Sequence, residues 1–170
     1  MPRLLLVALV LLFLAPGAAW ALDPAELEGK WVQDDEAANI AARDAAVDEA
    51  AGRFPYLVQG LVRKRLAEAV EIREFFRFAW SDPKLTISTE LGTGWTTELD
   101  GSAVDITSKK GESLVLSRRV EGGRLVSRVE AGRGVTTWTY RPVGDVLEVE
   151  VSVESKKLGD PVRYLLRYRR

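Results

Sequence analysis

The second half of the chain alternates apolar and polar residues in short segments that are separated by turn-forming residues. Leu147, Val149, Val151 and Val153, each followed by a polar residue, show this alternation most clearly. A period of two places one set of side chains on a single face of a β-strand. Repeated every 8–12 residues or so, such segments are typical of an all-β sandwich or barrel. We predict strands over residues 85–91, 95–99, 103–108, 113–120, 125–131, 135–141, 146–154 and 162–169.

The connections between these strands are short, and each holds a residue that tolerates the positive φ of a tight hairpin. Short connections produce an up-and-down meander. Together with a further strand around Trp31, the sheet would have about nine or ten strands. An open sheet of that size leaves exposed edges, which proteins avoid. We therefore expect a closed antiparallel barrel in which the last strand lies beside the first.

The fold class predicted is mainly β with a helical insert, because two helical segments occupy residues 35–80. The first, residues 34–51, is rich in Ala, the best helix former, and ends at Gly52. The second runs from Pro55 to about Ala79, and its apolar residues follow the i, i+3, i+4 spacing of one buried face. The insert follows a capped helical turn at 23–26 and the short strand at Trp31.

Two charged clusters lie in this insert. Asp34-Asp35-Glu36 stands at the start of the first helix, where carboxylates complement the helix dipole; the alternative is a metal site. Arg63-Lys64-Arg65 lies on the second helix. We interpret it as a solvated helix face, and its alternative is a contact with anionic lipid.

The N-terminus has the pattern of an export signal. Met1-Pro2-Arg3 precedes an apolar run from Leu4 to Ala15, and Ala19-Trp20-Ala21 follows. A charged start, a short apolar run and a small-x-small site are typical of a cleavable signal peptide. The run is shorter than the roughly 20 residues that span a bilayer. We predict a signal peptide over 1–21 and a single domain over 22–170, the alternative being an uncleaved anchor.

Cleavage after Ala21 would release a periplasmic or extracellular protein with no later transmembrane segment. It would not be a lipoprotein, because the chain has no Cys. The chain also has no His, which excludes Ser-His-Asp and Cys-His catalysis and zinc sites built on imidazole. With a formal net charge of −1, the chain lacks the excess of basic residues that is typical of nucleic-acid-binding proteins. We therefore predict no enzyme activity, no cofactor, no metal and no nucleic-acid partner.

The segment Gly29-Lys30-Trp31, preceded by a capped turn, resembles the Gly-x-Trp opening of the calycins, which comprise lipocalins and fatty-acid-binding proteins. The order of first strand, two helices and meander is similar to the fatty-acid-binding branch. The resemblance implies that Gly29 and Trp31 close one end of the barrel. It also implies that an arginine near the chain end, Arg167 or Arg169, packs over the indole as a cation–π contact.

The closing strand, residues 164–170, also resembles that family but departs from it at one position. Fatty-acid-binding proteins close with Arg-x-Tyr, whose side chains hold the ligand carboxylate. If Tyr168 matches that Tyr, Leu166 occupies the Arg position.

Arg118 is the most informative polar residue of the meander, because it shares parity with Leu114, Leu116 and Val120. An inward arginine needs an acidic partner or an anionic ligand, such as a lipid carboxylate. The alternative is a position at the rim, or a bulge that turns Arg118 outward. The other candidate ligand-binding residues share an inward face that also includes Val104, and each aromatic among them has core packing as its alternative. These candidates are Trp95, Thr97, Trp138, Tyr140 and Tyr164.

Three functions fit this sequence. The first is an exported binding or carrier protein that holds a small apolar or amphipathic ligand, such as a lipid, inside the barrel. The second is a filled barrel without a ligand, which would serve as an interaction or envelope-maintenance module. Its protein partner would bind the helical insert through exposed Phe75, Phe78 or Trp80. The third is an isomerase- or lyase-like enzyme, which needs two titratable groups that converge in a cavity.

Overall fold

The computed structural model describes residues 22–92, 94–108, 111–132 and 134–170. The predicted signal peptide and its cleavage site lie outside these residues. No helix in the described ranges is long and apolar enough to cross a bilayer.

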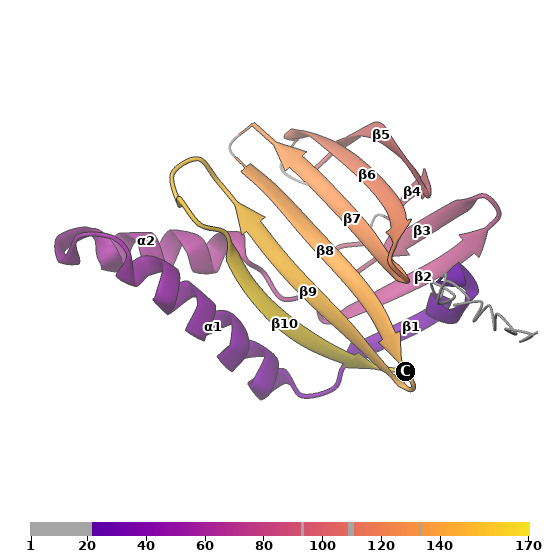
Figure 1. Ribbon diagram of the computed structural model, residues 1–170, viewed down its shortest axis with the longest axis horizontal. Helices are drawn as coiled ribbons and strands as arrows, with labels where there is room; N and C mark the ends of the chain where they lie inside the picture. Colours follow the sequence, from indigo (N-terminus) through magenta and orange to yellow (C-terminus); the bar gives the residue numbers. More distant parts are fainter. Residues whose placement is uncertain (1–21, 93, 109–110, 133) are drawn as a thin grey trace, which may run out of the picture.

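Ten strands form one antiparallel sheet that curls into a nearly closed barrel (Figure 1). The strand order is β4-β3-β2-β1-β10-β9-β8-β7-β6-β5. The strands are β1 (Gly29–Gln33), β2 (Phe75–Ser81), β3 (Lys84–Ser88), β4 (Trp95–Glu98), β5 (Asp100–Thr107), β6 (Ser113–Glu121), β7 (Arg124–Ala131), β8 (Gly134–Val143), β9 (Val146–Glu154) and β10 (Val162–Arg169). The last strand pairs with the first, Val32 opposite Arg169, as the meander predicted. The sheet ends at β4 and β5, so the barrel is open along the line between these two strands.

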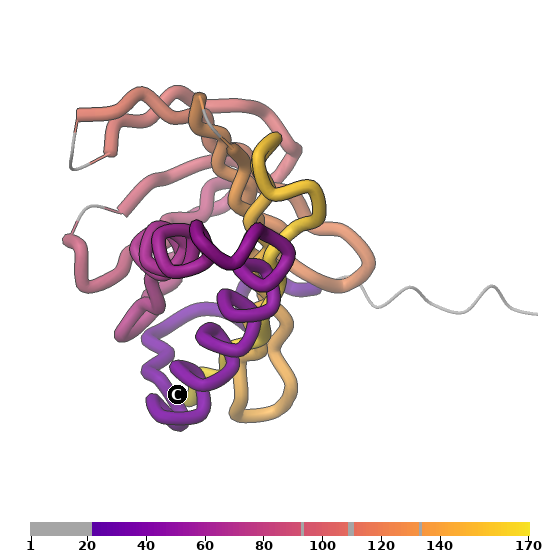
Figure 2. The backbone as a smooth tube through the Cα atoms, turned by 90° about the vertical axis from the view of Figure 1, so that its left-hand side faces the viewer, coloured from indigo at the N-terminus to yellow at the C-terminus, as the bar shows by residue number. Residues whose placement is uncertain are grey.

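Two helices, α1 (Glu36–Gly52) and α2 (Tyr56–Ala69), connect β1 to β2, and a short 3-10 turn (Pro24–Leu27) precedes β1. The predicted caps are confirmed: the Asp23 carboxylate accepts from the backbone N–H of Ala25 at 2.9 Å, and Asp35 accepts from Ala38 at 2.9 Å. Gly29 begins β1 with a φ of 112°, a conformation that L side chains rarely adopt. Both helices lie on the side of β10, and they stand in front of the strands when seen from the left of that view (Figure 2).

The second predicted helix is wrong beyond Ala69, because residues 75–81 form strand β2. The helical insert therefore spans 36–69 and not 35–80. In β2, the buried rings of Phe76 and Phe78 alternate with exposed Arg77 and Ala79, which is the period of a strand. Pairing with β1 on one side and β3 on the other fixes this conformation. A short apolar run does not distinguish the two periods locally.

The apolar face of α2 was also predicted wrongly. Leu57 is 94% exposed and Leu61 is 54% exposed, and Leu66 is the buried residue of this helix. Helix α1 makes the main contact with the barrel instead. Its residues Val47 and Ala50 are buried in the same hydrophobic cluster as the inner face of β10.

Asn39 joins α1 to the barrel through the backbone of β10. Its Oδ1 accepts from the N–H of Arg167 at 2.9 Å, and its Nδ2 donates to the carbonyl of Arg167 at 3.0 Å. The side-chain amide thus reproduces the two hydrogen bonds of a neighbouring strand. Asn39 is 3% exposed, so both backbone groups of Arg167 depend on partners within the protein.

Trp31 on β1 is fully buried, and its Nε1 donates to the carbonyl of Leu27 at 2.8 Å. Its role in closing the end of the barrel stays a prediction. The arginine over its ring is Arg170, whose guanidinium carbon lies 4.5 Å from the ring centroid. The prediction of Arg167 or Arg169 was wrong. Both alternate outward on β10, where they pair with acidic side chains, whereas Arg170 follows the end of the strand.

Candidate ligand-binding site

The two ends of the barrel differ in packing. At the end that holds Trp31, four aromatic rings pack edge to face or tilted, with neighbouring centroids 5.0–6.3 Å apart. These are Phe76, Phe78, Tyr140 and Tyr168. Towards the other end, inward positions such as Leu114, Val129 and Trp138 are only half-buried. The barrel therefore has a filled end and a more accessible end.

One row of residues crosses the inner wall between these ends. Arg118 on β6 lies opposite Ser127 on β7, Ser127 opposite Trp138 on β8, Trp138 opposite Val151 on β9, and Val151 opposite Tyr164 on β10. Directly opposed residues of an antiparallel sheet share a face. The sequence separates these positions, and the strand register brings them into one belt.

Arg118 connects this row to the strands on the far side of the β4–β5 opening. Its Nη1 donates to the carbonyls of Trp95 at 2.8 Å and Leu85 at 3.0 Å, and to Thr97 Oγ1 at 3.3 Å. Its Nε donates to Ser127 Oγ at 3.4 Å. With 3% of its surface exposed, Arg118 points into the barrel, so the alternative of a rim or outward position is wrong.

The charge of Arg118 has no carboxylate partner. No described acidic side chain lies within 4.0 Å of its guanidinium, and carbonyl and hydroxyl oxygens surround it instead. Burial lowers the pKa of Arg118 to about 10, so the group stays protonated at neutral pH. An inward arginine was expected to have either an acidic partner or an anionic ligand; among the described residues it has no acidic partner, and four neutral oxygens accept its hydrogen bonds.

Several polar groups on or near this row, among them Nη2 of Arg118 and the hydroxyls of Tyr140 and Tyr164, have no hydrogen-bond partner among the described residues. None of these three is among the fully inaccessible unpartnered atoms, so each keeps a small accessible area. Burial raises the pKa of Tyr140, and the charge of Arg118 opposes that rise. A neutral tyrosine hydroxyl beside a charged guanidinium can donate a second hydrogen bond to a shared anion.

The other two inward tyrosines differ in their hydroxyl contacts. Tyr168 donates to the carbonyl of Arg73 at 2.9 Å, so its hydroxyl is already occupied. Burial raises the pKa of Tyr168, and it raises that of Tyr164 to about 12. Leu166, which stands two residues before Tyr168, is an apolar core residue that is 2% exposed. The family's Arg-x-Tyr arrangement is therefore not reproduced on this strand.

The structure places the six predicted ligand-binding residues along the inner wall. Arg118, Trp138 and Tyr164 share the inner row, Thr97 and the Trp95 carbonyl contact Arg118, and Tyr140 lies on the next inward row. A ligand-binding role for them stays a prediction. Val104 occupies the predicted inward position, opposite Leu116, and it is 38% exposed because its strand borders the β4–β5 opening.

Sequence reasoning missed two partners of Arg118. Ser127 has the inward parity of Leu125, so the alternation of β7 contained the signal for it. The carbonyl of Leu85 carried no such signal, because it is a backbone group 33 residues away from Arg118.

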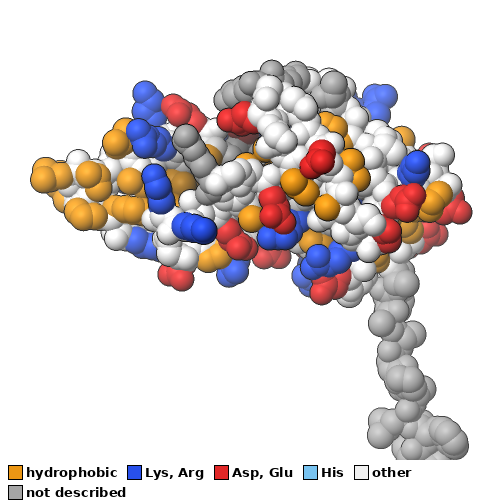
Figure 3. Space-filling model, turned by 90° about the horizontal axis from the view of Figure 1, so that it is seen from above, with side chains coloured by type: hydrophobic (Ala, Val, Ile, Leu, Met, Phe, Trp, Pro, Cys, Tyr) orange, Lys and Arg blue, Asp and Glu red, His pale blue; other side chains and the backbone are white. Residues whose placement is uncertain are grey.

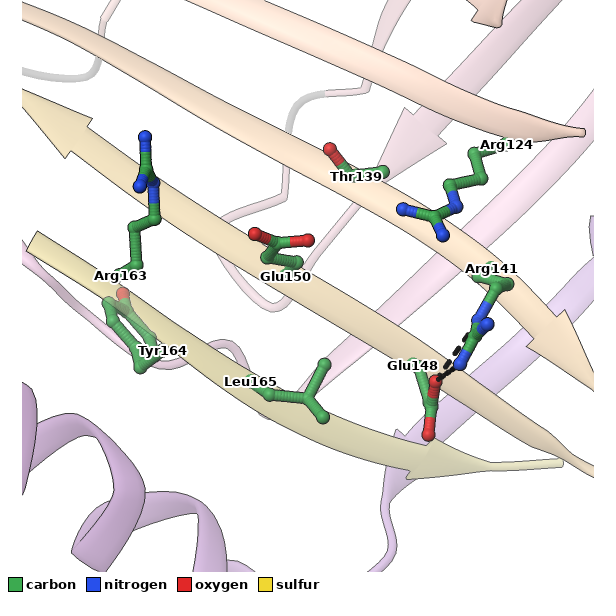
Figure 4. Close-up of a pocket in the computed structure, with 8 residues that line it drawn as sticks. All are labelled: Arg124, Thr139, Arg141, Glu148, Glu150, Arg163, Tyr164 and Leu165. Carbon is green, nitrogen blue, oxygen red and sulfur yellow. Dashed lines mark hydrogen bonds and ion pairs between the residues drawn. The ribbon is translucent and has the colours of Figure 1, made fainter. Parts of the chain in front are cut away.

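Two pockets lie outside the barrel. The first, about 340 Å³, is on the outer face of β7 to β10 (Figure 4). There Arg141 donates hydrogen bonds to Glu148, and the side chains of Arg163 and Glu150 also line the pocket. The second, about 300 Å³, lies between α1 and the β9–β10 connection, beside Arg53. Both are lined mainly by solvated charged side chains. They share only Tyr164 with the predicted site.

The acidic cluster at the start of α1 is engaged in structural contacts. Asp35 caps the helix and Asp34 pairs with Arg169 at 2.8 Å. No group of three potential ligand side chains is placed to hold a metal ion within the described part of the chain.

Comparison with solved structures shows what this architecture is. A secretary abundant heat soluble protein from Ramazzottius varieornatus aligns with a TM-score of 0.58 and 17% identity, over 85% of this chain and 95% of that one. A Schistosoma mansoni fatty acid binding protein in complex with arachidonic acid aligns with a TM-score of 0.54 and 12% identity, over 86% and 96%. The chain has the fatty-acid-binding-protein fold. Zebrafish ileal bile acid-binding protein complexed with cholic acid shares it, with a TM-score of 0.54, 12% identity and coverage of 85% and 98%.

The calycin fold inferred from Gly29-Lys30-Trp31 and the element order is thus confirmed. At these identities the likeness concerns the fold alone. No protein-family model matches the sequence, and the search of curated proteins finds no match.

Proposed function

We propose that the protein is an exported carrier that binds a small hydrophobic or amphipathic ligand inside the barrel. The observation that carries this proposal is the charge of Arg118, which is buried without a carboxylate partner among the described residues in a mainly apolar inner wall. Structures that share the fold are named for binding fatty acids and bile acids, which supports a carrier and not an enzyme. The signal-peptide pattern of residues 1–21 supports export.

The ligand in this proposal is an amphiphile with one anionic group. Its anion accepts hydrogen bonds from Arg118 Nη2 and the Tyr140 hydroxyl, which neutralises the buried guanidinium. Its apolar part lies along the inner row, where Trp138 and Val151 supply apolar surface. The ligand thereby supplies acceptors for two groups that have no hydrogen-bond partner among the described residues.

The first test is native mass spectrometry of the mature protein purified gently from its own compartment, followed by organic extraction. A reproducible extra mass that disappears on extraction is expected, and its composition identifies the ligand. The intact mass also tests export, since cleavage after Ala21 predicts a chain that begins at Leu22. A bare protein that takes up no fatty acid or phospholipid would contradict the carrier proposal.

The second test uses a matched pair of arginine variants and a matched pair of probes. The probes are 11-(dansylamino)undecanoic acid and its methyl ester. A charged hydrogen bond contributes about 1.5–3 kcal/mol, so Arg118→Met should weaken binding of the acid by roughly 10- to 150-fold. The ester should bind both proteins similarly. Arg119→Met is the control, because Arg119 is exposed and pairs with Glu121 on the outer face.

A second candidate function is docking to an anionic membrane surface through α2. Four apolar side chains are exposed at the start of this helix: Tyr56, Leu57, Val58 and Leu61. They gather at the end of the molecule formed by the helices, with basic side chains beside them (Figure 3). Lys64 and Arg65 are exposed and have no ion-pair partner among the described residues, which favours an anionic surface.

The residues first predicted to form such a surface do not do so. Phe78 is 1% exposed, and Phe75 and Trp80 are half-buried on β2. Sedimentation with vesicles tests the α2 surface directly. Vesicles that contain phosphatidylglycerol should bind the protein, vesicles of phosphatidylcholine should bind it weakly, and Leu57→Ser with Leu61→Ser should abolish binding. If the double variant sedimented with phosphatidylglycerol vesicles as strongly as the wild-type protein, this second candidate function would be contradicted.

A further inference from the structure

The line between β4 and β5 is the weakest seam of the barrel wall. The strand order ends at these two strands, so no backbone ladder joins them, although Leu99 alone separates them in sequence. They meet at this corner and diverge from it. Val104, at an inward position of β5, is 38% exposed, whereas its neighbour across the ladder, Leu116, is 1% exposed. The interior is therefore accessible beside β5.

Arg118 crosses this seam from inside. It starts on β6, beyond β5, and its Nη1 reaches the carbonyls of Trp95 on β4 and Leu85 on β3. We refer to these two hydrogen bonds as the Arg118 bridge. A charged donor on two carbonyls is a stronger connection than a neutral hydrogen bond. The bridge therefore fastens the two sides of the seam where backbone pairing is missing.

A route under the helices would have to break different contacts. Asn39 binds both backbone groups of Arg167 on β10. At the far end of α1, Arg53 donates to the carbonyl of Asp160, next to the start of β10. Opening this route requires α1 to leave buried hydrogen bonds and core contacts, whereas the hydrogen bonds across the seam among the described residues all come from Arg118.

We propose that the β4–β5 seam is the route by which an anionic amphiphile reaches the interior, and that the Arg118 bridge holds this route closed until the ligand's anion binds. The inference rests on the proposed function and adds the regulation of the same site. A carboxylate is a better acceptor for guanidinium N–H groups than a backbone carbonyl. When it takes Nη1 as well as Nη2, the carbonyls of Trp95 and Leu85 lose their donor and β4 separates more readily from β6.

The bridge is tested first without ligand, by hydrogen–deuterium exchange. Arg118→Met should speed exchange of the backbone amides of β4 at least tenfold, with Arg119→Met as the control. Arg118→Lys keeps the charge but not the planar fork, and it should also speed exchange. Exchange in β4 that is equal in wild type, Arg118→Met and Arg118→Lys would overturn the bridge.

The route is tested by blocking it. The chain has no cysteine, so a single introduced thiol can be modified with a poly(ethylene glycol) maleimide. The variants are Val104→Cys beside the seam, Val58→Cys on α2 and Leu165→Cys on the outer face of β10. Stopped-flow association of 11-(dansylamino)undecanoic acid should slow at least fivefold for the Val104→Cys adduct and remain unchanged for the other two.

The outcomes separate the two proposals. Slow association for the Val58→Cys adduct with normal association for the Val104→Cys adduct would overturn the seam as the route and leave the carrier function intact. Failure of the wild-type protein to bind either the acid or its ester would instead contradict the carrier function, and with it the route. The exchange experiment still decides whether Arg118 fastens β4, because it needs no ligand.

Discussion

Replacing Asn39 with alanine should destabilise the protein by about 2–3 kcal/mol. The change leaves the N–H of Arg167 buried without an acceptor, which costs about 1–3 kcal/mol. The carbonyl of Arg167 loses one donor, worth about 0.5–1.5 kcal/mol, but keeps the N–H of Asp34 at 3.1 Å. Alanine's better helix propensity returns about 0.5 kcal/mol.

The assay is urea unfolding followed by tryptophan fluorescence, with thermal unfolding as a second measure. For a domain of this size, about 3 °C per kcal/mol gives a fall in Tm of about 6–9 °C. Ile40→Ala is the control, because Ile40 neighbours Asn39 in α1 but is 38% exposed. Its cost should stay below about 1 kcal/mol. A cost for Asn39→Ala below about 0.5 kcal/mol, or equal to that of the control, would refute the role given to the amide.

Three further predictions concern the barrel itself. Gly134→Ala should cost about 1–3 kcal/mol in a urea titration, since its Cβ would collide with the backbone of β9, whereas Gly132→Ala, with open space around it, should be nearly neutral. Trp31→Phe should lower the free energy of unfolding by about 1–3 kcal/mol, because it removes a buried hydrogen bond and part of the side-chain volume. Arg170→Ala should lower it by about 0.5–1 kcal/mol through the lost cation–π contact. Equal effects of the two substitutions would contradict the dominant role given to the buried indole. Burial raises the pKa values of Tyr140, Tyr164 and Tyr168, so these tyrosines keep protons that the unfolded state loses above about pH 10. The free energy of unfolding should therefore fall as the pH rises from about 10 to 12. The lowered pKa of Arg118 acts in the opposite direction. Tyrosinate absorbance beyond that of the exposed Tyr56 that appears well before the loss of folding would show that the buried rings are accessible.

The strands after residue 84 were predictable because their signal is local. In β9, Leu147 to Val153 alternate strictly, and the boundaries of this strand in the structure are those predicted. Short turns then limit each strand to pairing with the next, except that β4 and β5 do not pair, and closure pairs the last strand with the first. Arg118 could be placed inward by the same parity. For these features the sequence was sufficient, since the period and the turns act within a few residues.

Strand β2 was not predictable in this way. Residues 75–79 extend a helical apolar spacing, and their strand conformation depends on pairing with β1 and β3. The exposure of Leu57 and Leu61 likewise follows from where α1 packs, since a helix can present an apolar face that no part of the barrel covers. Local periodicity identifies a face but not its partner.

The meander, the barrel, the capped helix starts and the inward parity of Arg118 could be inferred from the amino-acid sequence, because each depends mainly on neighbours close along the chain. Which groups these elements contact depends instead on the folded arrangement of the whole chain. Asn39 meets Arg167 across 128 residues, and Arg118 meets the carbonyl of Leu85 across 33. Such pairs arise when the barrel curls and closes, so their partners are set by the register and curvature of the whole sheet, which no local pattern encodes.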